Sequence, residues 1–400
     1  MFYPHGGGAE FATYLYAKLL GKAGSEVAVV TNRMTGEPEF SKKEDFDIYR
    51  LPLFENNKGL KYSIFMRFDI LLSKFIRDLV KWADVVYVPR FWYSAIPFVK
   101  ALGKPVITHI HDFFPICSLS NRFNVAENKL CNVSASFCSP KCIYSYERML
   151  GKNIFETLTS IGLNLGLGKV ISKLAKFSDA VICVSKFQKQ IIIDQDASFR
   201  EKINVIYNPL SPAPSIKMEG DDFAYFGGFN YLKGFQTLFQ AVKYMNRRST
   251  NHNLTRIHVT NSSESFGQSP DSLREQGLLV YRKLSRVECD ILYKQIRAVI
   301  VPSICPEALP YVVSEAITRG RFVIASRIGG IPELVENCKG AILFEPGNEK
   351  ELANAIEVVK AMDRKEIVSL GLQSKKKFNM NFNNERSIKE FIRICESLTK

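Results

Sequence analysis

Short apolar runs alternate with amphipathic stretches along most of the chain. The runs at 85–88, 106–111, 180–184, 203–207, 223–226, 257–260, 278–281, 298–301 and 322–325 have the length and composition of buried strands. Stretches of helical period stand between many of them, such as 11–22, 235–245 and 349–362. This alternation predicts an α/β protein built on parallel sheets.

A proline-rich segment at 208–214 divides this pattern into two similar halves. Three prolines within six residues predict a stiff, extended linker. We therefore expect a Rossmann-like domain at 1–208, a second at 209–378, and a closing helix in 379–400. In the first half we expect a loop or edge hairpin at 39–60, one helix at 63–82, a Cys- and Ser-rich excursion at 113–150, and helix interrupted by glycines at 154–177.

The start of the chain is abrupt. Gly6, Gly7 and Gly8 form a glycine-rich loop that opens a helix, yet no apolar strand precedes them. We expect either that the true start lies upstream or that the first domain lacks a central strand. A protein extended upstream should then be the more stable or more soluble form.

The stretch 298–335 carries the densest chemistry. A buried strand at 298–301 is followed by a proline-containing turn and a helix that Pro310 opens, where a missing N–H is tolerated. Glu307 lies in the turn and Glu315 in the helix. Both therefore belong to the C-terminal edge of a parallel sheet, where open α/β proteins bind ligands. The backbone amides of Tyr311 and Val312 at the helix start form an anion site, and the two acids suit the hydroxyl groups of a phosphorylated sugar or nucleotide.

This stretch resembles the retaining glycosyltransferases of family four, also called group 1 transferases. The resemblance rests on Glu307-x7-Glu315, preceded by Pro302-Ser303 and followed by Gly329-Gly330-x-Pro332-Glu333. It implies the GT-B fold, in which two Rossmann-like domains with parallel sheets face a central cleft. In this fold the closing helix, here in 379–400, packs back on the first domain. The resemblance also implies a nucleotide-sugar donor bound by the second domain and a reaction that needs no metal.

The resemblance assigns roles to individual residues. Glu315 would hold the ribose hydroxyls and Glu307 those of the donor sugar. His111, at the end of the strand 106–111, would support the reacting sugar. The groups expected to approach the diphosphate are Gly7, Gly8, Lys233, Tyr311 and Val312.

The chain departs from the family pattern at two of these places. Gly228 stands where an arginine usually grips the diphosphate, so one phosphate-binding cation is lost. Pro310 replaces a frequent glycine, although the next two amides remain. A second histidine, His109, is expected on the opposite face of its strand from His111, which makes it the weaker candidate.

Composition narrows the class of protein. A hydrophobic content of 46% and a charged content of 24% are those of a globular protein, and no apolar run approaches the ~18 residues needed to span a bilayer. We expect a cytoplasmic protein. The net charge of +14 favours anionic partners, which include the nucleotide-sugar, a polyprenyl- or lipid-linked glycan acceptor and the inner membrane surface. A solvated basic surface with no such macromolecular partner explains the charge equally well.

Four of the nine cysteines are clustered. Cys117, Cys131, Cys138 and Cys142 could hold structural zinc or an iron–sulfur cluster, although their spacing is not that of a standard zinc site. A pair of disulfides is the alternative.

The sequence supports one function above two others. We expect a retaining hexosyltransferase-like enzyme acting on a saccharide or lipid-linked acceptor. The lost arginine and the abrupt start would also fit a non-catalytic sugar-nucleotide-binding protein. A glycosyltransferase acting on nucleic acid ranks lower because the chain has no nucleic-acid-binding motif. The donor sugar, its base, the acceptor and the oligomeric state are not readable from the sequence.

Overall fold

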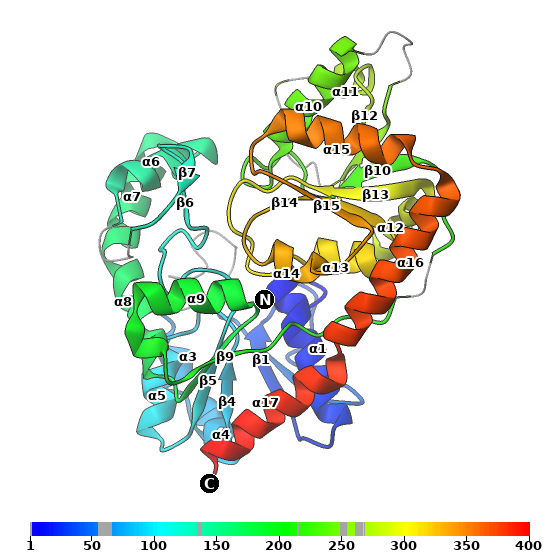
Figure 1. The fold of residues 1–400 in the computed structure, drawn as a ribbon. Helices are drawn as coiled ribbons and strands as arrows, with labels where there is room; N and C mark the ends of the chain where they lie inside the picture. Colours follow the sequence, from blue (N-terminus) through cyan, green and yellow to red (C-terminus); the bar gives the residue numbers. More distant parts are fainter. Residues whose placement is uncertain are drawn as a thin grey trace. The chain divides into compact units, whose positions relative to one another are not determined.

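The computed structural model describes residues 2–54, 66–133, 138–213, 216–248, 254–260, 267 and 269–400. Contacts divide the chain into two compact units (Figure 1). The first comprises Met1–Ser211 together with Asn383–Lys400, and the second comprises Pro212–Phe382. No helix in the described part of the chain combines the length and apolar character needed to cross a membrane.

The second unit is a doubly wound parallel sheet. Its six strands lie in the order β12-β11-β10-β13-β14-β15. They are β10 (Asp222–Tyr225), β11 (Ile257–Val259), β12 (Leu278–Val280), β13 (Ile296–Val301), β14 (Phe322–Ser326) and β15 (Ala341–Phe344). All pairs are parallel. The order reverses between β10 and β13, which is the kind of position where ligands bind in such sheets.

Helices cover both faces of this sheet (Figure 1). They are α10 (Phe235–Arg248), α11 (Pro270–Arg274), α12 (Arg286–Gln295), α13 (Tyr311–Thr318), α14 (Ile331–Val335), α15 (Glu349–Ala361) and α16 (Arg364–Asn381). Every residue of β13 and β14 is buried. The one charged side chain among them, Arg297, donates to the carbonyl oxygens of Val359 (2.6 Å) and Lys360 (2.7 Å) and to Asp221 (2.9 Å). Its charge thereby complements the C-terminal end of α15.

The described strands of the first unit form two larger sheets and a small hairpin. One sheet has the order β1-β3-β2 and the other the order β4-β5-β8-β9. The strands are β1 (Ala28–Asn32), β2 (Phe40–Lys42), β3 (Asp47–Leu51), β4 (Val86–Val88), β5 (Val106–Ile110), β8 (Ala180–Cys183) and β9 (Ile203–Val205). Only the β2–β3 pair of these two sheets is antiparallel.

Helix α1 (Gly8–Lys22) packs against both sheets of the first unit. Its Tyr16 belongs to a cluster with Ile107 of β5, whereas Ala17 packs with Phe46 and Ile48 beside and within β3. The last helix, α17 (Asn384–Leu398), adds Ile388, Phe391 and Ile394 to the Tyr16 cluster. The end of the chain is therefore part of the core of the first unit.

The remaining helices of the first unit differ from the expectation at one place. The single helix expected at 63–82 is wrong over its described part, because the chain forms α3 (Phe68–Leu71) and α4 (Lys74–Trp82). Ser73 separates them: its hydroxyl accepts the N–H of Ile76 (3.3 Å) and so starts a new helix. Residues 55–65 lie outside the described chain. The other helices are α5 (Ala95–Ala101) and α9 (Lys186–Gln195).

The excursion after β5 contains a hairpin and three helices. The hairpin pairs β6 (Phe123–Asn124) with β7 (Lys129–Leu130), and α6 (Pro140–Met149), α7 (Ile154–Leu165) and α8 (Leu167–Leu174) follow. These elements pack next to one another within the first unit (Figure 1). As expected from the glycines, the helix at 154–177 is interrupted, with Gly166 between α7 and α8.

Candidate functional site

Glu307 lies in the loop between β13 and α13, at the C-terminal edge of the second unit's sheet. Its Oε1 accepts hydrogen bonds from Lys233 Nζ (2.6 Å) and Ser303 Oγ (2.8 Å). Burial would lower the pKa of Lys233, but the charge and hydrogen bond of Glu307 raise it above its ordinary value. Two expected donor-binding side chains, 74 residues apart in the chain, are thus in direct contact.

Close backbone packing holds this pair in place. Gly329 has φ +63°, and a Cβ there would lie 2.2 Å from the carbonyl oxygen of Glu307. The next residue, Gly330, donates its N–H to that same oxygen (2.8 Å). Gly234, beside Lys233, has φ +80° and would place a Cβ 1.7 Å from Pro302 O. Only glycine allows both approaches, which explains the glycine next to Lys233 and the glycine whose turn packs against Glu307.

Of the two side-chain cations that usually bind the donor diphosphate in this family, the chain has the lysine, Lys233, and lacks the arginine. Helix α13 begins at Tyr311 after Pro310 as its N-cap, so the amides of Tyr311 and Val312 belong to its first turn. Gly228, which stands in place of the usual arginine, has φ +60°. An L-residue in this left-handed conformation costs about 1–2 kcal/mol. The local backbone therefore disfavours an arginine at this position.

Glu315 lies one turn further along α13 and is half-buried. Burial raises its pKa, and nearby Arg319 and Arg286 oppose that shift. Arg319 itself donates to Asp290 (3.0 Å) and lies over the ring of Tyr293. The carboxyl group of Glu315 therefore lies near charged residues of α12 in a partly desolvated setting, where a hydrogen bond to a ligand hydroxyl is stronger than in water.

In the first unit, the glycine-rich loop is tied to the ends of two strands. Gly7 donates its N–H to Glu10 Oε2 (2.8 Å), and Arg90, which follows β4, donates to Glu10 Oε1 (2.5 Å). The other nitrogen of Arg90 lies 3.6 Å from Asp112 Oδ2, just beyond β5. Burial would raise the pKa of Glu10, but Arg90 and the N–H of Gly7 lower it overall. Gly7 and Gly8 are thereby held at the sheet edge that carries His111.

His111 presents a buried nitrogen toward this edge. Its Nε2 has no hydrogen-bond partner within the described residues. Burial, reinforced by the charge of Arg90, lowers its pKa to about 3. A buried polar atom without a partner is uncommon in native proteins, and a neutral imidazole nitrogen can either donate to or accept from a ligand hydroxyl.

The expectation for His109 is wrong. It was placed on the opposite face of β5, yet its ring stacks on that of His111 with centroids 4.1 Å apart. Residues two apart in a strand point to the same face, so the two histidines had to be neighbours. His109 is fully buried, and its Nδ1 is bound to the hydroxyl of Tyr87 (2.7 Å). His109 therefore packs against the ring of His111 in the interior and is not exposed to a ligand.

The four clustered cysteines come together within the excursion. Ser118, next to Cys117, donates to Cys138 Sγ (3.7 Å), and Cys142 Sγ donates to Phe123 O (3.8 Å). Burial raises the pKa of Cys142 to about 11, and the charges of the other three thiols add to the effect. All are free thiols. Among the residues that the structure describes, no group of three or more His, Cys, Asp or Glu is placed to hold a metal ion.

Sequence reasoning missed three residues of these sites. Ser303 was noted only as part of a motif, and neither Arg90 nor Glu10 was given a role. Arg90 did carry a signal, because it stands two residues after the expected strand 85–88, and position at a strand end is the feature that singled out His111. Its partner Glu10 is 80 residues away, so the contact itself was not readable.

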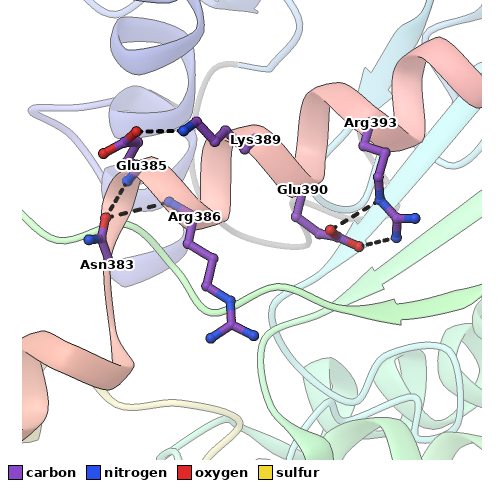
Figure 2. A pocket seen from close by; sticks show the side chains of 6 residues that line it. All are labelled: Asn383, Glu385, Arg386, Lys389, Glu390 and Arg393. Carbon is purple, nitrogen blue, oxygen red and sulfur yellow. Dashed lines mark hydrogen bonds and ion pairs between the residues drawn. The ribbon is translucent and has the colours of Figure 1, made fainter.

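A hollow along α17 is separate from these residues. Figure 2 shows the six side chains that line it: Asn383, Glu385, Arg386, Lys389, Glu390 and Arg393. Lys389 pairs with Glu385 (2.6 Å), and Arg393 pairs with Glu390 (2.5 Å). Exposed pairs along one helix are an ordinary surface pattern, and the hollow contains none of the expected site residues.

Family comparisons cover most of the chain. Residues 6–213 match the family described as Glycosyltransferase Family 4, and residues 220–360 match Glycosyl transferases group 1. Two uncharacterized glycosyltransferases of Methanocaldococcus jannaschii are similar in sequence. One is 24% identical over 56% of this chain and 60% of its own length; the other is 26% identical over 45% and 50%. The matched part of the chain thus spans only half to three fifths of the length of these relatives.

Solved structures share the fold over nearly the whole chain. Sucrose-phosphate synthase from Thermosynechococcus elongatus has a TM-score of 0.68 and 14% identity, covering 98% of this chain and 94% of its own. A glycosyltransferase from Rickettsia africae has a TM-score of 0.66 and 18% identity, covering 100% and 97%. Anabaena HepE, in complex with UDP and glucose, has a TM-score of 0.64 and 17% identity, covering 100% and 98%. The fold is therefore GT-B, with one Rossmann-like sheet in the second unit.

Proposed function

Because the chain belongs to glycosyltransferase family 4, we propose that it is an enzyme that transfers a sugar from a nucleotide-sugar to an acceptor hydroxyl. The observation that carries this proposal is Glu307, held between Lys233 and Ser303 at the switch point of the second unit's sheet. An acid fixed there can accept hydroxyl hydrogen bonds from a sugar. The adjacent ammonium can at the same time offset the charge of a departing diphosphate.

Each remaining residue has a proposed part. Glu315 accepts hydrogen bonds from the ribose hydroxyls, and the amides of Tyr311 and Val312 bind the diphosphate with Lys233. In the first unit, Gly7 and Gly8 let the backbone approach the donor closely, and His111 supports the reacting sugar through its unpartnered Nε2. HepE, which has the same fold, is known in complexes with UDP and glucose and with UDP-glucose. UDP-sugars are accordingly the first donors to examine.

We infer a retaining reaction without a catalytic metal. Ser303 donates its hydroxyl proton to Glu307, and burial raises the pKa of Cys305 to about 12, so neither neighbour is an activated nucleophile. The acceptor oxygen would therefore bond to the anomeric carbon on the face from which the diphosphate leaves. The departing phosphate oxygen would take the acceptor's proton. The acceptor we propose is a saccharide or a lipid-linked saccharide, with the protein at the cytoplasmic membrane face. Gly228, in place of a phosphate-binding arginine, keeps a non-catalytic sugar-nucleotide-binding protein as the second candidate.

A donor panel tests the proposal. Thermal shift and donor hydrolysis would be measured with UDP-, GDP- and ADP-sugars, followed by transfer to saccharide acceptors and analysis of the anomeric configuration. We expect one class of donor to raise the melting temperature and to be consumed. Glu307→Ala should abolish at least 99% of the turnover, about 3 kcal/mol of transition-state stabilisation, while the exposed Glu357→Ala retains it.

The outcomes separate the two candidates. Donor binding without turnover in the unaltered chain would favour the binding protein. Turnover that survives Glu307→Ala would refute the role given to this acid. An inverted product would refute the retaining reaction, and activity lost on chelation and restored by a divalent cation would refute metal independence.

A further inference from the structure

Helix α7 is packed with its polar residues inward. Its buried side chains are Thr157, Ser160 and Asn164. Its apolar residues Ile154, Phe155 and Leu158 are instead 44%, 79% and 56% exposed. Spacings of one and four residues place these three on one side of the helix. We call them the α7 face. A surface helix normally has the opposite arrangement.

A polar network fixes α7 in this orientation. Glu147 of α6, which is buried, accepts a hydrogen bond from Ser160 Oγ and pairs with Lys152 (2.6 Å). Asn164 donates to Ser160 O (2.8 Å), one turn earlier on α7. Asn153 caps the helix by accepting the N–H of Glu156 (2.9 Å). Turning the helix to bury its apolar residues would remove Ser160 from Glu147, a buried acid on α6, and the loss of a hydrogen bond to a buried charged group is unfavourable.

We propose that the α7 face docks on the surface of a lipid bilayer that contains anionic lipid. At 12 residues, α7 is about 18 Å long, too short to span a bilayer. Its phenylalanine and aliphatic side chains are suited to insertion at the boundary between headgroups and acyl chains, with the helix axis parallel to the membrane.

Charge around the α7 face selects the kind of surface. Helices α6 to α8, residues 140–174, contain five basic and two acidic residues. One of the two acids, Glu147, is buried and paired with Lys152. Lys141 on α6 and Lys173 on α8 are both exposed, on the two helices that pack against α7. Basic residues beside inserted apolar groups favour anionic phospholipids over neutral ones.

Vesicle binding by the full-length chain tests the proposal. Co-sedimentation would be measured with vesicles of phosphatidylcholine alone and of phosphatidylcholine with phosphatidylglycerol. We expect binding to the anionic vesicles that weakens as salt is added. The pair Phe155→Ser and Leu158→Ser should lower the affinity about tenfold or more. The pair Lys141→Glu and Lys173→Glu should also lower it about tenfold or more, by removing the preference for anionic lipid.

Matched variants elsewhere on the surface serve as controls. Val358→Ser with Met380→Ser removes exposed apolar residues, 50% and 68% exposed, from the second unit. These should leave vesicle binding unchanged. Equal binding by the α7-face variant and the unaltered chain, or no binding to any vesicle, would overturn the proposal. The proposal would also be overturned if the unaltered chain self-associated without lipid and the Phe155→Ser, Leu158→Ser variant did not. The α7 face would then join two copies of the chain.

The membrane proposal and the proposed function can fail separately. Docking would bring the enzyme to a lipid-linked acceptor and in that sense extends the proposed function. Vesicle binding is measured without substrate, whereas donor hydrolysis is measured without vesicles. The α7-face variant should keep its donor hydrolysis, since none of its altered residues belongs to the proposed site.

Discussion

At the scale of single residues, the candidate sites of the two units each contain an acid paired with a cation. The site of the first unit also contains an imidazole, His111, whose Nε2 has no hydrogen-bond partner among the described residues. Glu10 and Glu307 each place a buried or nearly buried carboxyl group against one cation, Arg90 and Lys233 respectively. His111 instead stays neutral because burial and the charge of Arg90 both oppose its protonation. These settings determine which groups change the stability of the protein with pH.

Replacing His111 should reduce the acid sensitivity of the protein. The pKa of His111 falls from 6.5 to about 3 on folding. Between these values the unfolded chain binds a proton that the folded chain excludes, so stability declines as the pH is lowered through 6.5. The loss reaches about 2 kcal/mol at pH 5. His111→Gln should remove that part of the slope in denaturant titrations, while the slopes of the two proteins coincide above pH 7.5. Equal slopes below pH 6.5 would contradict the assignment.

Removing Lys233 should harm the protein mainly through Glu307. Lys233→Met leaves a carboxylate that is only 13% exposed beside a single hydroxyl donor. We expect a loss of roughly 1–2 kcal/mol in the free energy of unfolding. Glu307→Gln in the same chain should restore roughly 1 kcal/mol of it, as measured by a double-mutant cycle. Strictly additive effects would show that the pair is not coupled.

At the scale of elements, the β13–loop–α13 unit and the two glycine turns beside it act together. The strand and helix bring Glu307 and Glu315 to one edge because of their local order in the sequence. The exact place of Glu307, however, depends on the approach of Gly329 from the turn after β14. A local motif and a packed neighbour are both needed.

Adding one carbon at Gly329 should separate a steric effect from a conformational one. Gly329→Ala must displace the backbone of Glu307. We expect it to lower the free energy of unfolding by ~3 kcal/mol or more and to weaken donor binding. Gly347→Ala is the matched control, because Gly347 also has a positive φ of +79° but nothing lies within 4 Å of a Cβ there. The Gly347→Ala variant should lose about 1 kcal/mol in the free energy of unfolding and should still bind the donor. Chemical denaturation and donor thermal shifts measure both, and similar losses for the two variants would argue against the contact.

At the scale of the whole molecule, the chain returns to its first unit at its end. Helix α17 follows the second unit in sequence, yet its apolar residues complete the core around Tyr16 and Ile107. The first unit is therefore built from both ends of the chain, with the entire second unit inserted between them. Its stability should depend on the last eighteen residues.

Phe391 tests this dependence. It is only 3% exposed and contacts Tyr16 and Tyr87 through its ring. Phe391→Ala should destabilise the first unit by about 3–5 kcal/mol, seen as an earlier unfolding transition in calorimetry. The control Phe155→Ala, at a side chain 79% exposed, should leave the melting profile unchanged. A profile for Phe391→Ala that matches the unaltered chain would show that α17 adds little to this core.

Features that depend on neighbours in the chain can be predicted from local sequence. Buried strands, the β-α-β unit with Glu307 and Glu315, the glycine turns and the interruption at Gly166 all follow from short-range pattern, because period, turn chemistry and capping act over a few residues. The family motif is also local in sequence, and the resemblance that it carries predicts roles for Lys233 and His111.

Tertiary structure alone decided which distant groups meet. It paired Arg90 with Glu10, placed α1 across two sheets, stacked His109 on His111 and turned the polar side of α7 inward. Each of these depends on how whole elements pack, where the burial of one side chain is settled by its partners from elsewhere in the chain. In α7, Ser160 donates to the buried Glu147 of α6, and the apolar residues Phe155 and Leu158 face outward.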